Sequence, residues 1–384
     1  MSTDISSISS HYVCDMKNIL FFHFDLQGGG AEKVLVNLLN NLDANKYRIT
    51  LQTIFGTGPN IKDIPHNVRF EYLFKKIFRG SSRIMKFAPP WLLHRLIVRD
   101  NYDIEVAFIE SSPTRITSAC PNKKTKKIAW VHTTYTKDHS IIKSYRNRNE
   151  AVKAYNKFDH IAFVSEDTLK AFQAMMPEVT VPMSVVHNVI DLDQTRQLAQ
   201  EPCPIVCDKS LVNLYSVGRL TKVKGFDRLL NCLSKLVAGG ISNFHLYLLG
   251  QGEEHDNLIA LTESLGLNDY VSFLGYDTNP YRYAKQMDLF VCSSYIEGYS
   301  TAVTEAITLG VPVLTTKCSG MNEILQEGKY GMIVPNDEAS LLEGLKELIV
   351  DTNKIDEYRQ RIAAGEKMTT QTFVAKYEEL FDTI

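Results

Sequence analysis

The sequence predicts an α/β protein with two doubly wound, parallel-sheet domains that face each other across a cleft. Its 384 residues are too many for one compact core and suit two domains. In both halves of the chain, short apolar runs typical of buried strands alternate with helical patterns, which favours parallel sheets. A polar segment with two prolines lies between the halves, near residues 192–209. We therefore expect an N-terminal domain over 1–195 and a C-terminal domain over 205–367.

The expected elements follow this alternation along the chain. Strands of the first half are predicted at 18–24, 47–55, 104–109, 127–132, 160–165 and 184–189. Strands of the second half are predicted at 211–218, 244–250, 270–275, 289–294 and 311–316, with helical patterns at 225–237 and 257–266. After the first strand, one helical face is formed by Ala31, Val34, Leu35, Leu38, Leu39 and Leu42. The last segment, about 368–384, reads as an amphipathic helix that packs back on the N-terminal domain.

The bulk composition excludes several classes of protein. With 44% hydrophobic and 22% charged residues the chain is an ordinary globular protein, without an apolar run near the roughly 18 residues of a membrane span. The first residues lack the pattern of a secretory signal, so a cytoplasmic protein is expected. The seven cysteines are scattered and never form a CxxC pair, which argues against a disulfide framework and a zinc site. The net charge of −2 hides an excess of about seven bases in residues 1–200 and about nine acids in 201–384.

Three glycines, Gly28, Gly29 and Gly30, follow the first predicted strand and open the first predicted helix. Such a turn lets an anion approach the unpaired N–H groups of a helix N-terminus. The segment lacks the GxGxxG spacing, and TIFGTGPN lacks the acid that a dinucleotide site needs at the end of the second strand. Nicotinamide binding is therefore disfavoured, while a tight turn without a ligand stays open.

A second loop with ligand-binding character is YSVGRLTKVKGFDRLL, where Arg219 and Lys224 stand five positions apart between a strand and a helix. An arginine fork and a lysine charge that converge at a helix N-terminus suit a diphosphate. Gly225 would let that helix start close to the ligand. The alternative is a pair of solvated surface cations.

The stretch EGYSTAVTE places Glu297 and Glu305 eight positions apart around a helix start. Ser300 is a plausible N-cap, and at 100° per residue the two carboxylates would not share a helical face, so Glu297 belongs to the preceding loop. A ligand lying across the helix start would meet Glu297, then the backbone N–H groups of 298–300, then Glu305. Carboxylates suit sugar hydroxyls and N–H groups suit phosphate, which together describe a nucleotide sugar.

These motifs, in combination, resemble the family 4 retaining glycosyltransferases of the GT-B fold, which have two Rossmann-like domains. The resemblance rests on EGYSTAVTE, on GRLTKVKGFD about 80 residues earlier, on LLGQGEEHDNL, VSFLGY and GVPVLTTKCSGMNEIL, and more weakly on GGGAEKVLVNLL, WVHT, FVSE and VVHNVID. It implies that Arg219 and Lys224 hold the donor diphosphate and that Glu305 binds the ribose. It also implies that Glu297 and the backbone of Gly298, Tyr299 and Ser300 grip the transferred sugar. Many members have Gly or Pro where this chain has Ser300.

The same resemblance implies roles for six more positions. His132 would face the reaction centre, although a satisfied structural histidine is the alternative. Gly29 and Gly30 would approach the donor phosphates, and Gly275 in VSFLGY would belong to the donor site. Asn188 and Asp191 in HNVID match a family motif at the hinge, where a structural role is equally open.

The expected chemistry needs no cofactor and no metal. Arg219, Lys224 and the helix dipole can stabilise the departing nucleoside diphosphate, and the DLD sequence at 191–193 falls at the linker. Retention of configuration requires either a protein nucleophile or front-face attack by the acceptor. The resemblance favours front-face attack, with Glu297 as a sugar-binding group.

The acceptor side is suggested by the basic segments 75–99 and 121–127. The first holds seven Lys or Arg and no acid among aromatic and aliphatic residues, and the second adds four cations. No nucleic-acid reader motif accompanies this charge, whereas an anionic bilayer would attract it. A peripheral protein on the inner face of the cell membrane is therefore expected, with a merely solvated surface as the alternative.

The sequence thus predicts a hexosyltransferase that moves a hexose or N-acetylhexosamine from a nucleoside diphosphate sugar, UDP favoured, to a lipid-linked glycan of a capsule, O-antigen or wall polysaccharide. One alternative is a soluble-acceptor enzyme of the sucrose or glycogen synthase kind. Others are a non-catalytic nucleotide-sugar-binding subunit and a sugar-nucleotide epimerase on the same fold.

Overall fold

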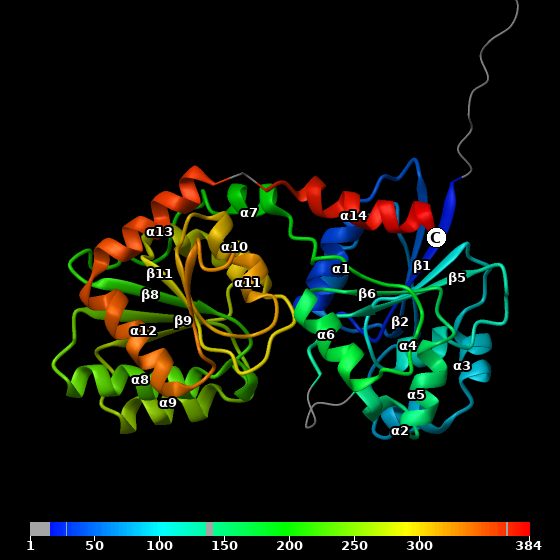
Figure 1. Cartoon of the computed structure of the whole chain (residues 1–384), viewed down its shortest axis with the longest axis horizontal. Helices are drawn as coiled ribbons and strands as arrows, with labels where there is room; N and C mark the ends of the chain where they lie inside the picture. Colours follow the sequence, from blue (N-terminus) through cyan, green and yellow to red (C-terminus); the bar gives the residue numbers. More distant parts are fainter. Residues whose placement is uncertain (1–15, 28, 136–140, 366–367) are drawn as a thin grey trace, which may run out of the picture.

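The computed structural model describes residues 16–27, 29–135, 141–365 and 368–384. The chain forms two α/β units side by side, each built on one parallel sheet (Figure 1). We call these sheets the N-terminal and the C-terminal sheet. The predicted fold class is confirmed.

The N-terminal sheet has seven parallel strands in the order β3-β2-β1-β4-β5-β6-β7. In chain order they are β1 (Lys17–His23), β2 (Tyr47–Phe55), β3 (Arg69–Phe74), β4 (Ile104–Ala107), β5 (Lys126–Val131), β6 (His160–Phe163) and β7 (Met183–Val185). The accompanying helices are α1 (Gly30–Asn41), η1 (Pro59–Asp63), α2 (Ser81–Phe87), α3 (Pro90–Ile97), α4 (Ser112–Thr117), η2 (Ile141–Ser144), α5 (Arg148–Tyr155), α6 (Glu166–Met175) and α7 (Leu192–Leu198).

The C-terminal sheet has six parallel strands in the order β10-β9-β8-β11-β12-β13. They are β8 (Val212–Val217), β9 (Phe244–Leu249), β10 (Val271–Gly275), β11 (Leu289–Cys292), β12 (Val313–Thr316) and β13 (Gly331–Val334). The helices are η3 (Lys222–Lys224), α8 (Phe226–Ala238), α9 (His255–Ser264), η4 (Pro280–Gln286), α10 (Thr301–Thr308), α11 (Met321–Ile324), α12 (Glu338–Val350), α13 (Thr352–Ala364) and α14 (Thr370–Thr383).

The strand order reverses at one point in each sheet, between β1 and β4 and between β8 and β11. Ligands of open parallel sheets bind outside the carboxyl ends of the strands at such switch points. The N-terminus of α1 follows β1, and the N-terminus of α10 follows β11, so both helix starts lie at these points. The fold therefore aims two sets of unpaired N–H groups at the region between the sheets.

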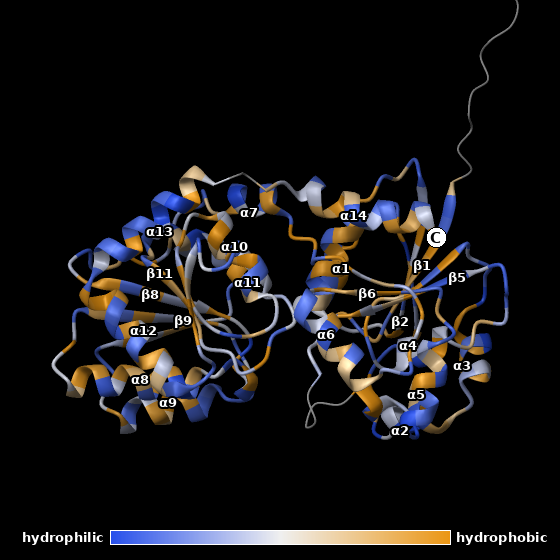
Figure 2. Ribbon diagram, viewed as in Figure 1, coloured by the Kyte–Doolittle hydropathy of each residue, from blue (hydrophilic) through white to orange (hydrophobic). Residues whose placement is uncertain are grey.

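Burial follows the hydrophobic pattern of the sequence. Apolar residues concentrate along the strands, and the helices alternate between polar and apolar faces (Figure 2). In α1, Val34, Leu35, Leu38 and Leu39 are buried, as the spacing predicts. The strands β3 and β13 were missed by the pattern, because both are edge strands with partly exposed residues and a weak alternation.

The segment expected to be a linker contains the helix α7. Asp191 caps it by accepting a hydrogen bond from the Gln194 N–H at 2.9 Å, while Leu192 is fully buried. Residues 199–211 form no regular element before β8. The sequence did not predict this helix, because α7 has only seven residues and most of them are polar.

The last helix, α14, lies across the N-terminal sheet, beside α1 (Figure 1). The ring of Tyr377 stacks on Trp130 of β5 with centroids 4.5 Å apart. Tyr47 donates a hydrogen bond to Asp382 at 3.0 Å. The chain thus crosses back to its first unit, although the domain limits 1–195 and 205–367 remain our proposal.

None of the helices in the described ranges is long and apolar enough to cross a membrane. The six described cysteines are all free, and Cys14 lies outside the described residues.

Candidate functional site

The loop between β11 and α10 forms one wall of the candidate site. Ser300 is the N-cap of α10, with its hydroxyl accepting from the Val303 N–H at 3.4 Å. A Cβ atom at Gly298 would lie 1.9 Å from the carbonyl oxygen of His132, at the end of β5. Only glycine fits there, so Gly298 lets the two units approach each other closely in this loop.

Glu297 and Lys224 form an ion pair in the structure. The sequence had suggested that they bind different parts of one ligand. The Lys224 Nζ lies 2.7 Å from Glu297 Oε1, which also accepts a hydrogen bond from the Ser294 hydroxyl at 2.6 Å. Burial alone would lower the pKa of Lys224, but the carboxylate of Glu297 raises it above the usual value. The Lys224 side chain is therefore charged at neutral pH.

The space beside this ion pair is small. The hollow lined by Ser216, Ser293, Ser294 and the two paired side chains has a volume of about 10 Å³. That is close to the least space that a single water needs. This hollow is therefore too small, as it stands, to admit a sugar.

Glu305 is held across the boundary between the units. Its Oε1 lies 2.8 Å from Nζ of Lys33, in the first turn of α1, and accepts a hydrogen bond from the Tyr281 hydroxyl at 2.9 Å. Lys33 also hydrogen-bonds the Tyr281 hydroxyl and lies over its ring. Burial would lower the pKa of Lys33, but Glu305 and Tyr281 raise it. Burial, with the nearby Glu305, raises the pKa of Tyr281 to about 12.

Arg219 is exposed and reaches the N-terminus of α1. A Cβ atom at Gly29 would lie 3.1 Å from its Nη2 and 2.1 Å from Oε2 of Glu32, so this glycine leaves room for both side chains. Burial raises the pKa of Glu32 to about 7, and the nearby Asp25 adds to the rise while Arg219 opposes it. Burial also raises the pKa of Asp25.

The remaining glycines of the turn bring the two helix starts together. A Cβ atom at Gly30 would lie 3.9 Å from Oγ1 of Thr301, the first residue of α10. Gly28 lies outside the described residues. The side chains predicted to bind the donor thus gather where α1 and α10 begin.

His132 ends its strand against Phe108, with ring centroids 4.8 Å apart. Neither ring nitrogen has a partner of good hydrogen-bond geometry in the described part of the chain. Burial and, to a smaller extent, the neighbouring His23 lower the pKa of His132 to about 3, although hydrogen bonds with Asn188 and the Phe108 backbone act in the opposite direction. His132 is therefore a neutral imidazole at physiological pH.

Comparison with known proteins identifies the family. The sequence profile "Glycosyltransferase Family 4" matches residues 28–194, and "Glycosyl transferases group 1" matches residues 208–368. An uncharacterised glycosyltransferase of Methanocaldococcus jannaschii is 31% identical over 289 residues, which span 68% of this chain and 67% of the relative. The chain belongs to the family 4 glycosyltransferases.

Other relatives of this glycosyltransferase cover almost its whole length. One is the N-acetylgalactosamine-N,N'-diacetylbacillosaminyl-diphospho-undecaprenol 4-alpha-N-acetylgalactosaminyltransferase of Campylobacter jejuni, 27% identical over 94% of this chain and 98% of the relative. Another is the lipopolysaccharide core biosynthesis glycosyltransferase LpsD of Rhizobium meliloti, 29% identical over 95% and 98% of the two chains. The predicted activity class is thus confirmed.

Solved structures share the fold. Anabaena HepE in complex with UDP and glucose has a TM-score of 0.73 at 19% identity, with 96% of this chain and 100% of that chain covered. Sucrose-phosphate synthase from Thermosynechococcus elongatus has a TM-score of 0.72 at 16% identity, with 96% and 98% covered. At such low identity the likeness shows the fold, which is the predicted GT-B architecture.

Three predicted residues of the glycosyltransferase lie at the edge of the site or turn away from it. Tyr299 is buried, with its ring stacked on His187 at 4.8 Å and its carbonyl accepting from Asn188 at 3.1 Å. Gly275 ends β10 with a φ of 70°, and its carbonyl accepts from the Gly250 N–H at 2.8 Å. Asp191 caps α7, as described above, which fits the structural alternative left open for it.

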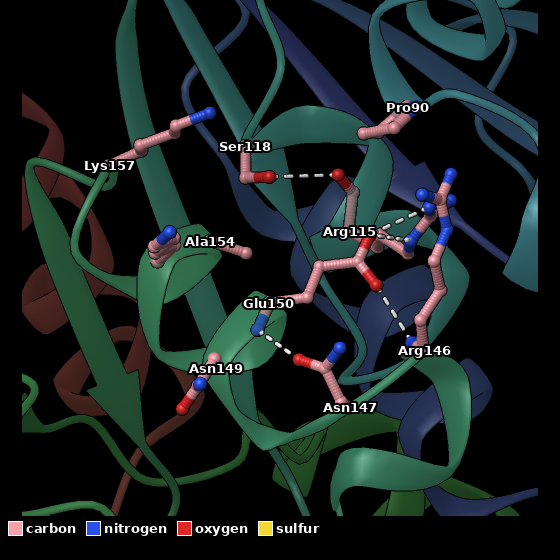
Figure 3. Close-up of a pocket in the computed structure, with 10 residues that line it drawn as sticks. Pro90, Arg115, Ser118, Arg146, Asn147, Asn149, Glu150, Ala154 and Lys157 are labelled. Atoms are coloured by element: carbon pink, nitrogen blue, oxygen red, sulfur yellow. Dashed lines mark hydrogen bonds and ion pairs between the residues drawn. The ribbon is translucent and has the colours of Figure 1, made fainter.

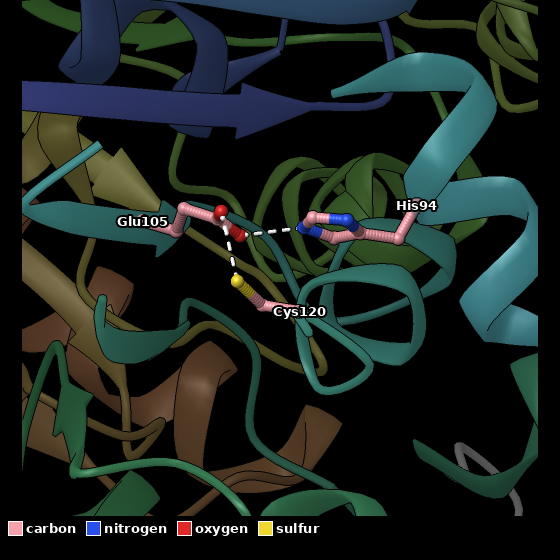
Figure 4. Close-up of side chains that lie close together, drawn as sticks. All are labelled: His94, Glu105 and Cys120. Atoms are coloured by element: carbon pink, nitrogen blue, oxygen red, sulfur yellow. Dashed lines mark hydrogen bonds and ion pairs between the residues drawn. The ribbon is translucent and has the colours of Figure 1, made fainter. Parts of the chain in front are cut away.

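Within the described residues, one cluster of side chains is close enough to hold a metal. It consists of His94, Glu105 and Cys120, whose candidate ligand atoms all lie within 4.8 Å of one another (Figure 4). His94 Nε2 lies 2.9 Å from one oxygen of Glu105, and the Cys120 thiol donates to the other at 3.2 Å. These contacts satisfy one another and fasten α3 to β4, away from the groups around α10.

Sequence reasoning missed Lys33, Tyr281 and Glu32 as members of the site. Lys33 and Glu32 belong to GGGAEK, where only the glycines were considered. A signal was present, because a charged residue in the first turn after a predicted glycine turn must lie beside the same switch point. Tyr281 lies in η4, where no motif marks it.

Proposed function

We propose that this glycosyltransferase moves a hexose or N-acetylhexosamine, with retention and without a metal, from UDP to a lipid-linked glycan of a surface polysaccharide. Several observations support it. Relatives are named for transfer to an undecaprenyl diphosphate-linked sugar and for lipopolysaccharide core biosynthesis, and HepE was solved with UDP. The observation that carries the proposal is the convergence of Arg219, the Lys224–Glu297 pair and Glu305 at the starts of α1 and α10.

Different residues of the site bind the diphosphate, the sugar and the ribose of the donor in this proposal. Arg219 and the N–H groups at the start of α10 face the diphosphate. When phosphate oxygens replace Glu297 as the partner of Lys224, the lysine neutralises the leaving group and the carboxylate turns to the sugar hydroxyls. The second oxygen of Glu305 remains for the ribose, because the first is taken by Lys33 and Tyr281.

The geometry at Glu297 favours front-face attack. Oε1 accepts a hydrogen bond from the Ser294 hydroxyl, which stays in place when Lys224 turns to the phosphate and weakens the carboxylate as a nucleophile. His132, held neutral by burial, suits the role of a hydrogen-bond acceptor for a sugar hydroxyl and not that of a proton donor to the departing phosphate. Charge on the leaving diphosphate is met by Arg219 and Lys224 without a metal.

The acceptor side fits an anionic bilayer surface. In residues 75–99 the side chains of Phe87, Trp91 and Leu96 are more than half exposed. Around them Lys75, Lys76, Arg79, Arg83, Arg95 and Arg99 are exposed. Each such cation contributes on the order of 1 kcal/mol near an anionic surface. We call residues 75–99 the basic-apolar face, and propose that it holds the enzyme on the inner face of the cell membrane.

The second basic segment supports this less strongly. Lys126 and Lys127 lie 3.4 and 3.9 Å from the carboxylate of Asp159, which offsets part of their charge. Lys123 and Lys124 remain exposed.

A transfer assay tests the function. The full chain is incubated with UDP-, GDP-, ADP- and dTDP-linked sugars and undecaprenyl diphosphate-linked acceptors in vesicles, with and without EDTA. We expect one UDP-sugar to be consumed with an α-linkage retained in the product by NMR, unchanged by EDTA. Transfer to a free saccharide alone would favour the soluble-acceptor alternative, and inversion or loss of activity in EDTA would refute the proposed mechanism.

A further inference from the structure

A pocket of about 500 Å³ lies in the N-terminal unit between α3, α4 and α5. It is separate from the groups around α1 and α10. Four cations line it: Arg115, Arg146, Lys153 and Lys157. Glu150 is the acid among the lining residues, so the pocket carries an excess of about three positive charges.

The acid in this pocket is already neutralised. Oε1 of Glu150 accepts from Arg115 Nε at 3.0 Å and from Nη2 at 2.7 Å, and its other oxygen accepts from the Arg146 N–H at 2.7 Å. Figure 3 shows the Glu150 carboxylate beside Arg115 and the backbone nitrogen of Arg146, with Lys157 on the other side of the pocket. Arg115 is buried and Glu150 is partly exposed, and the two side chains neutralise each other in the lining of the pocket.

The charges of the two lysines are not neutralised by a carboxylate in the described part of the chain. Lys153 and Lys157 are exposed, and among the described residues neither ammonium group has an ion pair or a side-chain hydrogen bond. The side chains of Ser118, Asn147 and Asn149 add neutral polar groups to the lining. Paired cations beside neutral donors suit a phosphate with hydroxyl groups attached.

The pocket is fastened to the basic-apolar face. Arg115 Nη1 donates to the carbonyls of Met85 and Ala88, both at 2.9 Å, and Arg146 Nη2 donates to Phe87 at 2.9 Å. Those carbonyls end α2, and Pro90, the first residue of α3, lines the pocket itself. A lipid whose chains lie against Phe87 and Trp91 would therefore have its headgroup beside the pocket.

We propose that this pocket binds the phosphate headgroup of an anionic membrane phospholipid, as a site separate from the donor site. The inference rests on the proposed membrane contact of the basic-apolar face and names its ligand. Phosphate diester and monoester share the required chemistry, but the link to the exposed apolar side chains favours a lipid over a free phosphate. The volume is within the range of small-molecule sites and far exceeds that of one phosphate, which fits a glycerol-bearing headgroup.

Vesicle binding with matched variants tests the pocket. The full chain, the double variant Lys153→Gln/Lys157→Gln and the control Lys209→Gln/Lys346→Gln are sedimented with vesicles of phosphatidylglycerol in phosphatidylcholine, and with phosphatidylcholine alone. Both double variants lose the same charge, and all four lysines are exposed. We expect the pocket variant to bind phosphatidylglycerol vesicles on the order of tenfold more weakly than the control, with equal melting temperatures.

The outcomes separate the pocket from the membrane contact. Equal binding of both double variants, with strong binding by the unmodified chain, would overturn the pocket and leave the basic-apolar face intact. Absence of binding by the unmodified chain would overturn both. A melting-temperature rise with millimolar inorganic phosphate that the pocket variant loses, without any difference on vesicles, would assign the pocket to a free phosphate and overturn the lipid.

Discussion

The two carboxylates that flank the start of α10 are held in different ways. Glu297 is paired within its own unit, by Lys224 and Ser294, whereas Glu305 is paired with Lys33 from the other unit. The partners of the Glu297 carboxylate therefore all come from the C-terminal unit. The ribose end takes its present form only where α1 meets α10.

The two ion pairs also differ in how far their side chains are exposed to solvent. The side chains of Lys224 and Glu297 are 29% and 11% exposed, and those of Lys33 and Glu305 are 41% and 11% exposed. Lys33 is the more exposed of the two lysines, so solvent screens its ion pair more than that of Lys224. The Lys33–Glu305 contact is suited to form and break as the units close and open over a donor.

The strongest expected effect concerns the pair inside the C-terminal unit. Lys224→Met removes the charge that we propose for the leaving diphosphate, and it leaves Glu297 without its ion-pair partner. We expect kcat/KM to fall by about 100-fold or more. The control is Lys222→Met in the same turn, whose side chain is exposed. Similar steady-state kinetics for the two variants would remove Lys224 from the site.

A smaller effect is expected for the pair between the units. Lys33→Met breaks the contact with Glu305 but leaves Tyr281 on the same oxygen. We expect kcat/KM to fall about tenfold, together with a larger radius of gyration by small-angle X-ray scattering, because the units open more readily. Lys62→Met, at an exposed position of the same unit, should change neither quantity. An unchanged radius of gyration for Lys33→Met would contradict a role in closure.

Local sequence patterns predicted one of these two carboxylate environments better than the other. The alternation of strands and helices was enough to predict two parallel sheets, and the local spacing in EGYSTAVTE was enough to place Glu297 in a loop and Ser300 at the N-cap. The alternation and the spacing are both patterns among residues that are close together in the sequence. The Lys33–Glu305 contact joins positions 272 residues apart, so no local pattern reveals it.

The Lys224–Glu297 contact was missed for another reason. Each side chain was assigned to a ligand group, and the possibility that opposite charges satisfy each other in the protein was not considered. The short edge strands β3 and β13 escaped because half-exposed strands lose the apolar pattern on which strand prediction depends.

The smallest expected effect is a pH dependence at the start of α1, beside the contact between the units. Burial raises the pKa of Glu32 from its ordinary 4.5 to about 7. Between these values the folded chain keeps a proton that the unfolded chain has lost, so the contribution of Glu32 to stability falls as pH rises from 4.5 to 7.

Glu32→Gln removes this dependence. We expect the variant to be about 1 kcal/mol more stable than the unmodified chain at pH 8 and equally stable near pH 4.5, measured by urea unfolding, after allowing for partial exposure. Parallel stability curves for the two proteins across this range would show that Glu32 titrates normally.

We propose that a nucleoside diphosphate binds where α1 and α10 begin, and a measurement of UDP binding is the most direct test. Isothermal titration calorimetry of UDP is performed on the unmodified chain and on Arg219→Gln, Glu305→Gln and the control Lys222→Gln. We expect at least tenfold weaker binding for the Arg219 and Glu305 variants, which lack the groups proposed for the diphosphate and the ribose, and an unchanged Kd for the control. Equal affinity in all four proteins would contradict it.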